Sequence, residues 1–426
     1  MSVETATIEQ SAAGPRLELR AKLPAGLRAF NGVGRALKRL GVEVTRLDAE
    51  AEFRRAERVT GLSDWGQDQS FWTPARMLFE AAESEAGLHP FGRALFRVQM
   101  RRLLENRLKI EEDFKNHPEI RDVPIRRPLI VVGLPRSGTT LLHRLLALEP
   151  SGRPLVFWEA MWPSPPPEEA TYTTDPRVGR TRLLLKGLLG MMPALRAIHD
   201  AEADAPEECN PLLEHNFTAH TVGGALGSVT YVDWLLAHDM VGPYRFLRRL
   251  LQLLMWRKPA DHWVLKNPAH TWYLDALLAV FPDACLVQTH RDPKEVIPSL
   301  CSLWSQLRTL FTDRIDLRLT GRRATEIFAE ATRRALAVRA TADPARFLDV
   351  TYESLLRDPV SVVTRIHDHF GLPRSPDLAD RVRDWLAANP QHKHGSHRYT
   401  LEQFGLDAPT LDRAFADYRA AMPRGD

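Results

Sequence analysis

Cysteine is scarce in this sequence, whose 426 residues include only Cys209, Cys285 and Cys301. The spacing of the three matches no metal-binding motif, and three thiols cannot pair into a complete set of disulfides. Free thiols of this kind are typical of a reducing compartment, so a cytoplasmic protein is predicted. A secreted domain held together by disulfides is thereby excluded.

Long apolar runs are also missing. No stretch of about 18 or more apolar residues occurs, so no helix is predicted to span a membrane. The first residues, MSVETATIEQSAAG, lack the apolar core of an export signal. Their small and polar composition predicts that residues 1–15 are disordered.

The sequence also lacks a large excess of charge of one sign. Lys and Arg number 57 against 54 Asp and Glu, for a net charge of +3. So mild a balance is not typical of a protein that wraps nucleic acid, and no nucleic-acid partner is expected. It is compatible with a local basic pocket for a small anion.

The first part of the chain shows a helical pattern, and residues 16–124 are interpreted as a helical N-terminal region. Within Pro90–Lys115, for example, Phe91 and Leu95 are spaced by four residues. A basic amphipathic stretch, Arg28–Arg46, is compatible with peripheral membrane contact, although such a stretch is more often an ordinary solvated helix. This region is also a candidate for forming a homo-oligomer.

From residue 125 onward, short apolar runs alternate with helical patterns. Strands that are apolar on both faces and are followed by helices indicate a parallel sheet covered on both sides. We therefore predict a P-loop-type α/β domain over residues 125–426, with residues 16–124 as its helical extension. The predicted strands are Pro128–Gly133, Trp263–Lys266, Ala284–Thr289 and Arg346–Tyr352.

The strongest local motif is the segment Gly133–Thr140, GLPRSGTT, which follows a buried strand and opens a helix. Backbone N–H groups of such a loop, together with the helix N-terminus, form an anion site. A nucleoside triphosphatase loop has Lys where this chain has Thr139. Without that Lys a triphosphate is poorly held, whereas Arg136 inside the loop suits a shorter anion such as a phosphate joined to a sulfate.

The motif Pro135–Thr140 resembles the 5′-phosphosulfate loop of the sulfotransferase superfamily, P-[RK]-[ST]-G-T-T. It is most similar to a bacterial branch related to tyrosylprotein sulfotransferases. The resemblance implies transfer of a sulfuryl group from 3′-phosphoadenosine 5′-phosphosulfate (PAPS) to a hydroxyl, with release of adenosine 3′,5′-bisphosphate and with no metal. It implies that the donor's phosphosulfate is bound by Arg136, Ser137, Gly138, Thr139 and Thr140.

The same resemblance implies a second anion site. In the family, an Arg after the next strand and a Ser eight residues later hold the 3′-phosphate, and Arg291 and Ser299 match in type and spacing. Tyr352 resembles a family tyrosine beside the cofactor. Lys393, in a late basic loop, is the candidate for a lid over the phosphosulfate.

Two catalytic residues are implied by the resemblance to the tyrosylprotein enzymes. Lys266 at the end of the strand WVLK is expected to contact the leaving oxygen, and Glu159 is the leading candidate for the base that takes the acceptor's proton. A small insertion leaves the register of Glu159 open. Other candidates for the base are His270, His215, His220 and the pair Glu207 and Glu208.

The acceptor is expected to carry a hydroxyl and to be a small molecule or lipid rather than a protein, with an apolar alcohol preferred. Two other functions remain open from the residues alone. A P-loop kinase would need a loop Lys and a strand-end Asp for Mg²⁺, for which only Asp349 is available. A non-catalytic nucleotide-binding protein would have no need of Lys266 or of the base candidates.

Overall fold

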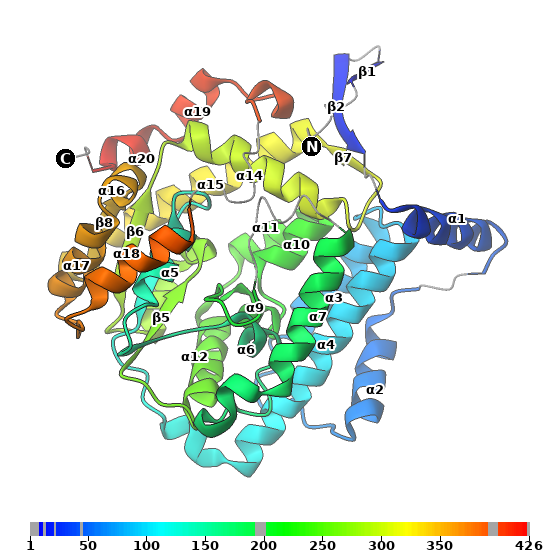
Figure 1. Ribbon diagram of the computed structural model, residues 1–426. Coiled ribbons are helices and arrows are strands. Elements are labelled where there is room, and N and C mark those ends of the chain that lie inside the picture. Colours follow the sequence, from blue (N-terminus) through cyan, green and yellow to red (C-terminus); the bar gives the residue numbers. More distant parts are fainter. Residues whose placement is uncertain are drawn as a thin grey trace.

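A computed structural model of the chain describes residues 8–11, 14–20, 23–42, 46–191, 202–390 and 399–423 (Figure 1). Its centre is a five-stranded sheet in the order β4-β5-β3-β6-β8, in which every neighbouring pair is parallel. A smaller antiparallel sheet has the order β1-β2-β7. The predicted α/β class, with a parallel sheet flanked by helices, is confirmed.

All four predicted strands are present in the parallel sheet, each within a residue or two of its expected ends. The fifth strand was not predicted, because three residues that include a Gly and a Pro carry no strand pattern. It lies at the edge of the sheet, where a Pro is tolerated. The strands are β3 Leu129–Gly133, β4 Gly152–Pro154, β5 His262–Lys266, β6 Cys285–His290 and β8 Phe347–Thr351.

Alternate side chains of the central strand enter two different cores. Ile130 and Val132 of β3 pack in the larger cluster, whereas Leu129 and Val131 pack in the smaller one. This is the result expected of a strand buried on both faces. The smaller cluster is covered by α5 Thr139–Leu146, α16 Tyr352–Arg357, α17 Pro359–Phe370 and α18 Leu378–Ala388.

The larger cluster joins the opposite face of the sheet to the N-terminal helices, so both parts of the chain share one core (Figure 1). The N-terminal helices are α1 Ala25–Arg39, α2 Ala49–Thr60, α3 Trp72–Ser84 and α4 Pro90–Asn116. The remaining helices are α6 Phe157–Met161, α7 Pro176–Met191, α9 Asn210–Glu214, α10 His220–Leu226, α11 Val229–Ala237, α12 Val241–Met255, α13 Leu274–Val280, α14 Pro293–Arg308, α15 Leu317–Arg339, α19 Ala408–Ala414 and α20 Ala416–Ala421. Short 3₁₀ helices span Pro118–Asp122, Glu169–Thr174, Pro268–Tyr273, Pro344–Arg346 and Glu402–Phe404. In the part of the chain that the structure describes, no helix is both long and apolar enough to cross a membrane.

Within residues 1–15, for which disorder is predicted, the described residues 8–11, 14 and 15 lie in strands. Ile8–Ser11 forms β1 and Gly14–Arg20 forms β2, and β2 pairs with β7, Arg314–Asp316. The partner strand lies some 300 residues further along the chain, as the paired residues Glu18 and Asp316 show. Local composition carries no signal of so distant a partner, and tertiary contacts decide the conformation of such a segment.

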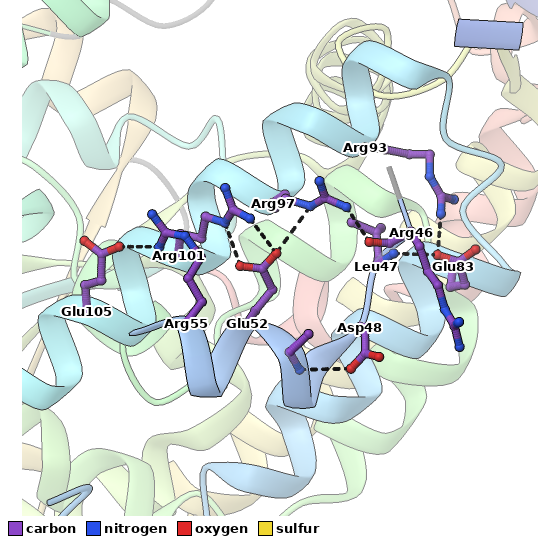
Figure 2. Close-up of polar contacts among 11 residues, drawn as sticks. Arg46, Leu47, Asp48, Glu52, Arg55, Glu83, Arg93, Arg97, Arg101 and Glu105 are labelled. Carbon is purple, nitrogen blue, oxygen red and sulfur yellow. Dashed lines mark hydrogen bonds and ion pairs between the residues drawn. The ribbon is translucent and has the colours of Figure 1, made fainter. Parts of the chain in front are cut away.

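An arginine and glutamate network fastens α2 to α4 (Figure 2). Glu52 of α2 is only 5% exposed, and its two carboxylate oxygens accept hydrogen bonds of 2.6 and 2.8 Å from Arg101 of α4. Arg97, one turn earlier on α4, lies 3.4 Å from the same carboxylate. Arg55 of α2 donates to Glu105 at 2.7 Å. One buried carboxylate thus serves two guanidinium groups.

We expect the substitution Glu52→Gln to lower the free energy of unfolding by about 1–3 kcal/mol, because it leaves two partly buried arginines without their counter-charge. Urea-induced unfolding followed by circular dichroism measures this loss. Glu50→Gln, on the same helix, is the matched control. Glu50 pairs with Arg76 where both side chains are about half exposed, so its loss is expected to cost less than about 0.5 kcal/mol. Equal losses in the two variants would contradict the prediction.

Candidate active site

The carboxyl ends of the parallel strands bring several of the predicted site residues to one edge of the sheet. Gly133 ends β3, Lys266 ends β5, and His290 ends β6. The next residues along the chain are the phosphate loop, the segment after Lys266, and Arg291. This is the edge at which open parallel sheets bind their ligands.

The phosphate loop leads directly into the N-terminus of α5. Gly138 has a φ of +92°, and a Cβ there would lie 2.9 Å from Cδ2 of Tyr352, so only glycine fits. Arg136 also has a positive φ, of 66°, which is unusual for a residue with a side chain. No side chain of the described residues caps the start of α5. Its first N–H groups therefore point to where an anion would bind.

Hydroxyl groups from neighbouring strand ends hold this loop in shape. The Ser137 hydroxyl is fully buried, lies 2.6 Å from the Thr289 hydroxyl and donates to the Leu134 carbonyl at 2.5 Å. The Gly133 N–H donates to the Thr271 hydroxyl at 3.2 Å. Sequence reasoning missed Thr289 and Thr271. The available signal was that Thr289 is the last residue of a predicted strand and that Thr271 lies in the segment after another.

A cluster beside the loop joins Arg136, Arg291, Ser299 and Tyr352. Arg136 Nε donates to the Ser299 hydroxyl at 3.2 Å, and Arg291 Nη1 donates to the Arg136 carbonyl at 3.1 Å. The Arg291 guanidinium lies 4.1 Å from the centre of the Tyr352 ring. Residues from three separate segments of the chain thus meet in one place, and they bring two guanidinium groups and a hydroxyl together.

Arg291 has an internal counter-ion. Its Nε and Nη2 donate to Glu295 Oε2 at 2.9 and 2.6 Å, one turn along α14. The sequence analysis did not single out Glu295. Burial lowers the pKa of Arg136. Tyr399, in the C-terminal segment, opposes that shift. Lys393, the predicted lid residue, lies outside the described residues.

Lys266 lies between the phosphate loop and a carboxylate. Its side chain is 2% exposed, and its Nζ is 2.5 Å from Oε1 of Glu208 and 3.4 Å from the hydroxyl of Thr140. Glu208 is held in place by its neighbours, because the Cys209 N–H donates to the Lys266 carbonyl at 3.0 Å and Asn267 donates to Asn210 at 3.1 Å. Glu208 is therefore the carboxylate that pairs with Lys266.

Glu159 is bound elsewhere. It is fully buried, and its carboxylate accepts a hydrogen bond from Arg153. Burial raises the pKa of Glu159, and Arg153 and Tyr172 oppose the shift. Arg153 in turn donates to the carbonyls of Leu254 and Lys258 at 2.5 and 3.0 Å. Through these contacts, Glu159 and Arg153 attach the segment after β4 to the end of α12.

The three histidine candidates also have their own partners. His270 Nδ1 lies 2.6 Å from the Tyr244 hydroxyl, His215 Nε2 lies 3.0 Å from the Asn106 amide, and His220 Nε2 lies 2.9 Å from the Tyr273 hydroxyl. Burial lowers the pKa of each to about 3. A histidine with so low a pKa is a weak base near neutral pH.

A known family accounts for this arrangement. The model of a sulfotransferase family matches residues 128–377, which include the loop Gly133–Thr140, Lys266, Arg291 and Ser299. The chain belongs to the sulfotransferase family. It is a PAPS-dependent enzyme that transfers a sulfuryl group to a hydroxyl. The kinase and the non-catalytic alternatives are not favoured.

Mycobacterial sulfotransferases are among the similar proteins. The structure of sulfotransferase STF9 from Mycobacterium avium is 31% identical, with a TM-score of 0.82 over 89% of this chain and 97% of that one. STF1 from Mycobacterium tuberculosis H37Rv is 31% identical, with a TM-score of 0.77 over 88% of this chain and 100% of that one. The omega-hydroxy-beta-dihydromenaquinone-9 sulfotransferase Stf3 of Mycobacterium bovis is 26% identical over 288 residues, which are 65% of this chain and 71% of Stf3.

The residues of this sulfotransferase fit its donor. PAPS has two anionic ends, and the site has two matching features, the uncapped N-terminus of α5 and the pair Arg291 and Ser299, each of which contacts Arg136. Asp349, the residue that a kinase would need for Mg²⁺, is instead bound by other side chains. It accepts from Arg339 at 2.6 and 2.8 Å, and Arg339 and His290 hold its pKa well below the usual range despite its burial. Within the described ranges, no three His, Cys, Asp or Glu side chains form a cluster suited to a metal ion.

Proposed function

We propose that this sulfotransferase acts on a hydroxyl of a hydrophobic, lipid-like acceptor. The name of the M. bovis relative supports this class, because its acceptor is a hydroxylated menaquinone. The observation that carries the chemistry is the position of Lys266, with its Nζ between the Thr140 hydroxyl of the phosphate loop and the Glu208 carboxylate. An ammonium group and a carboxylate lie side by side next to the phosphate loop.

We assign the two anionic ends of PAPS to two different sets of residues. The N-terminus of α5, with Arg136, Ser137, Gly138, Thr139 and Thr140, binds the 5′-phosphosulfate. Arg291 and Ser299 bind the 3′-phosphate, and Tyr352 supports Arg291. The Arg291 contact with Tyr352 and the Arg136 contact with Ser299 support this division.

Lys266 and Glu208 would share the chemistry of transfer. The bond between sulfur and the bridging phosphate oxygen breaks, and Lys266 stabilises the charge that develops on that oxygen. A new bond forms between sulfur and the acceptor oxygen, and Glu208 takes the proton that this oxygen loses. The ion pair between Lys266 and Glu208 holds both side chains next to the phosphate loop. Glu159, the leading candidate from the sequence, has a buried arginine for its partner instead, so we propose Glu208 as the base.

The acceptor class can be tested with purified enzyme and PAPS. We expect a sulfate ester, detected by mass spectrometry, on a prenylated quinone that bears a terminal hydroxyl, and little or none on a tyrosine peptide. Lys266→Ala is the control for enzyme dependence and is expected to lose about 100-fold or more of the rate. Turnover of the peptide alone, or of short polar alcohols alone, would contradict a lipid-like acceptor.

We infer further that the enzyme works in the cytoplasm. Cys209, Cys285 and Cys301 are all free and buried, and burial raises the pKa of Cys209 and Cys301 to about 12. Thiols in this state are inert and are typical of a reducing compartment.

A further inference from the structure

Helix α1 lies at the edge of the molecule, on the opposite side from strands β5, β6 and β8 of the parallel sheet (Figure 1). Among the described residues, nine large apolar side chains are exposed, and four of them belong to α1 and the residues just after it. Their exposed fractions are large enough to exclude a core role: Phe30 49%, Val33 62%, Leu40 78% and Val42 49%. Exposed apolar groups gathered in one place mark an interaction surface.

A different face of α1 is fastened to the body. The side chain of Asn31 is buried, and its Oδ1 accepts a hydrogen bond of 2.8 Å from the Phe91 N–H at the start of α4. A Cβ at Gly34 would lie 2.6 Å from Cβ of Pro90, so this turn also packs closely. Phe30, Val33, Leu37 and Leu40 recur at helical spacing on another stripe. The body therefore holds the helix in place and leaves this stripe uncovered in the described structure.

An apolar groove of about 260 Å³ runs along this stripe. Its apolar lining comes from Phe30, Val33, Leu37 and Val42 on one side and from Leu88 and Pro90 on the other, and its polar lining from Arg35, Lys38, His89, Arg93 and Asp313. Phe30, Val33 and Val42 of this lining are also exposed to solvent. A hydrocarbon chain would therefore meet apolar groups on both sides.

The positive charge of residues 23–42 favours an anionic partner. Residues 23–42 contain Arg28, Arg35, Lys38 and Arg39 and no acidic residue. Arg35 pairs with Asp313 of the body at 2.6 Å, and Arg28 and Arg39 are exposed on the polar side of the helix. A second copy of α1 would bring like charges together, which disfavours self-association. An anionic surface would be attracted instead.

We propose that α1 is a membrane-docking helix that lies in the interface of an anionic lipid bilayer. Phe30, Val33 and Leu40 enter the boundary between headgroups and acyl chains, the groove takes part of an acyl chain, and the basic side chains contact lipid phosphates. This docking goes beyond sulfuryl transfer, and it suits an enzyme whose acceptor is a lipid. It does not depend on that proposed acceptor, because binding to lipid is measured without turnover.

The test is flotation of the full-length protein with vesicles of phosphatidylcholine, alone or with about 30 mol% phosphatidylglycerol. We expect binding to the anionic vesicles, weak binding to the neutral ones, and a loss of binding as salt is raised. The double variant Phe30→Ser with Val33→Ser is expected to weaken binding about tenfold or more. Val98→Ser is the matched control, since Val98 of α4 is 61% exposed and is outside the stripe.

Three results would overturn the proposal. The first is equal binding by the double variant and the control, and the second is a failure of the unmodified protein to bind anionic vesicles. The third is a change of oligomeric state in size-exclusion chromatography caused by the double variant, which would assign the stripe to contact between copies of the chain. Circular dichroism melting of the variants keeps these results separate from a loss of folding.

Discussion

Glu208→Gln is expected to lower kcat by about 10²–10³-fold while leaving the affinity for adenosine 3′,5′-bisphosphate unchanged or higher. The reason is that Gln cannot take the acceptor's proton, whereas loss of the negative charge beside Lys266 favours an anionic ligand. Steady-state sulfation rates per folded protein, together with calorimetric titration of the bisphosphate, measure the two effects separately.

Glu159→Gln provides the comparison, because it is the same chemical change at the other carboxylate. Its expected effect is on stability, with a loss of about 3 kcal/mol or more as the buried Arg153 loses its counter-charge. The kcat of the remaining folded protein is expected to change by only a few fold. The reverse pattern, with kcat lost in Glu159→Gln and kept in Glu208→Gln, would return the role of base to Glu159.

Arg291→Ala is expected to weaken binding of adenosine 3′,5′-bisphosphate by about 30-fold or more, since a charge-assisted fork to a phosphate is lost. Adenosine 5′-phosphate, which lacks the 3′-phosphate, should lose little affinity from the same substitution. Calorimetric titration of both nucleotides with both proteins gives the four dissociation constants needed.

Arg381→Ala is the matched control for that substitution. Arg381 also pairs with an acidic residue four positions away, Asp377, on an exposed helix, as Arg291 does with Glu295. Its removal should leave both affinities unchanged. If Arg291→Ala weakens both nucleotides equally, the 3′-phosphate is bound elsewhere and the assignment of Arg291 is wrong.

Much of the donor site follows from local sequence. A β-branched run, a loop with glycines at fixed positions and a helix start form one continuous segment, so Gly138 and Arg136 are recognisable without knowledge of any distant residue. The same holds for Arg291 and Ser299, which one strand and one helix place in a fixed relation. The ends of four of the five strands in the parallel sheet were predictable for the same reason.

The choice between carboxylates was not local. Glu159 and Glu208 lie in separate loops, and the spacing from the phosphate motif favoured Glu159. The structure joins Glu208 to Lys266 and joins Glu159 to Arg153. Which of the two meets the ammonium group depends on how the loop before α9 packs on the end of β5, through contacts such as Asn210 with Asn267.

The fold class and the family could be predicted from the sequence, because both depend on residues that are neighbours along one strand, loop or helix. Tertiary packing sets the partner of Lys266, the strand pairing of the N-terminus with Arg314–Asp316, and the exposed stripe of α1. These features arise where segments far apart in the chain pack together. Their free energy comes from contacts between distant residues, for which local periodicity and composition carry no signal.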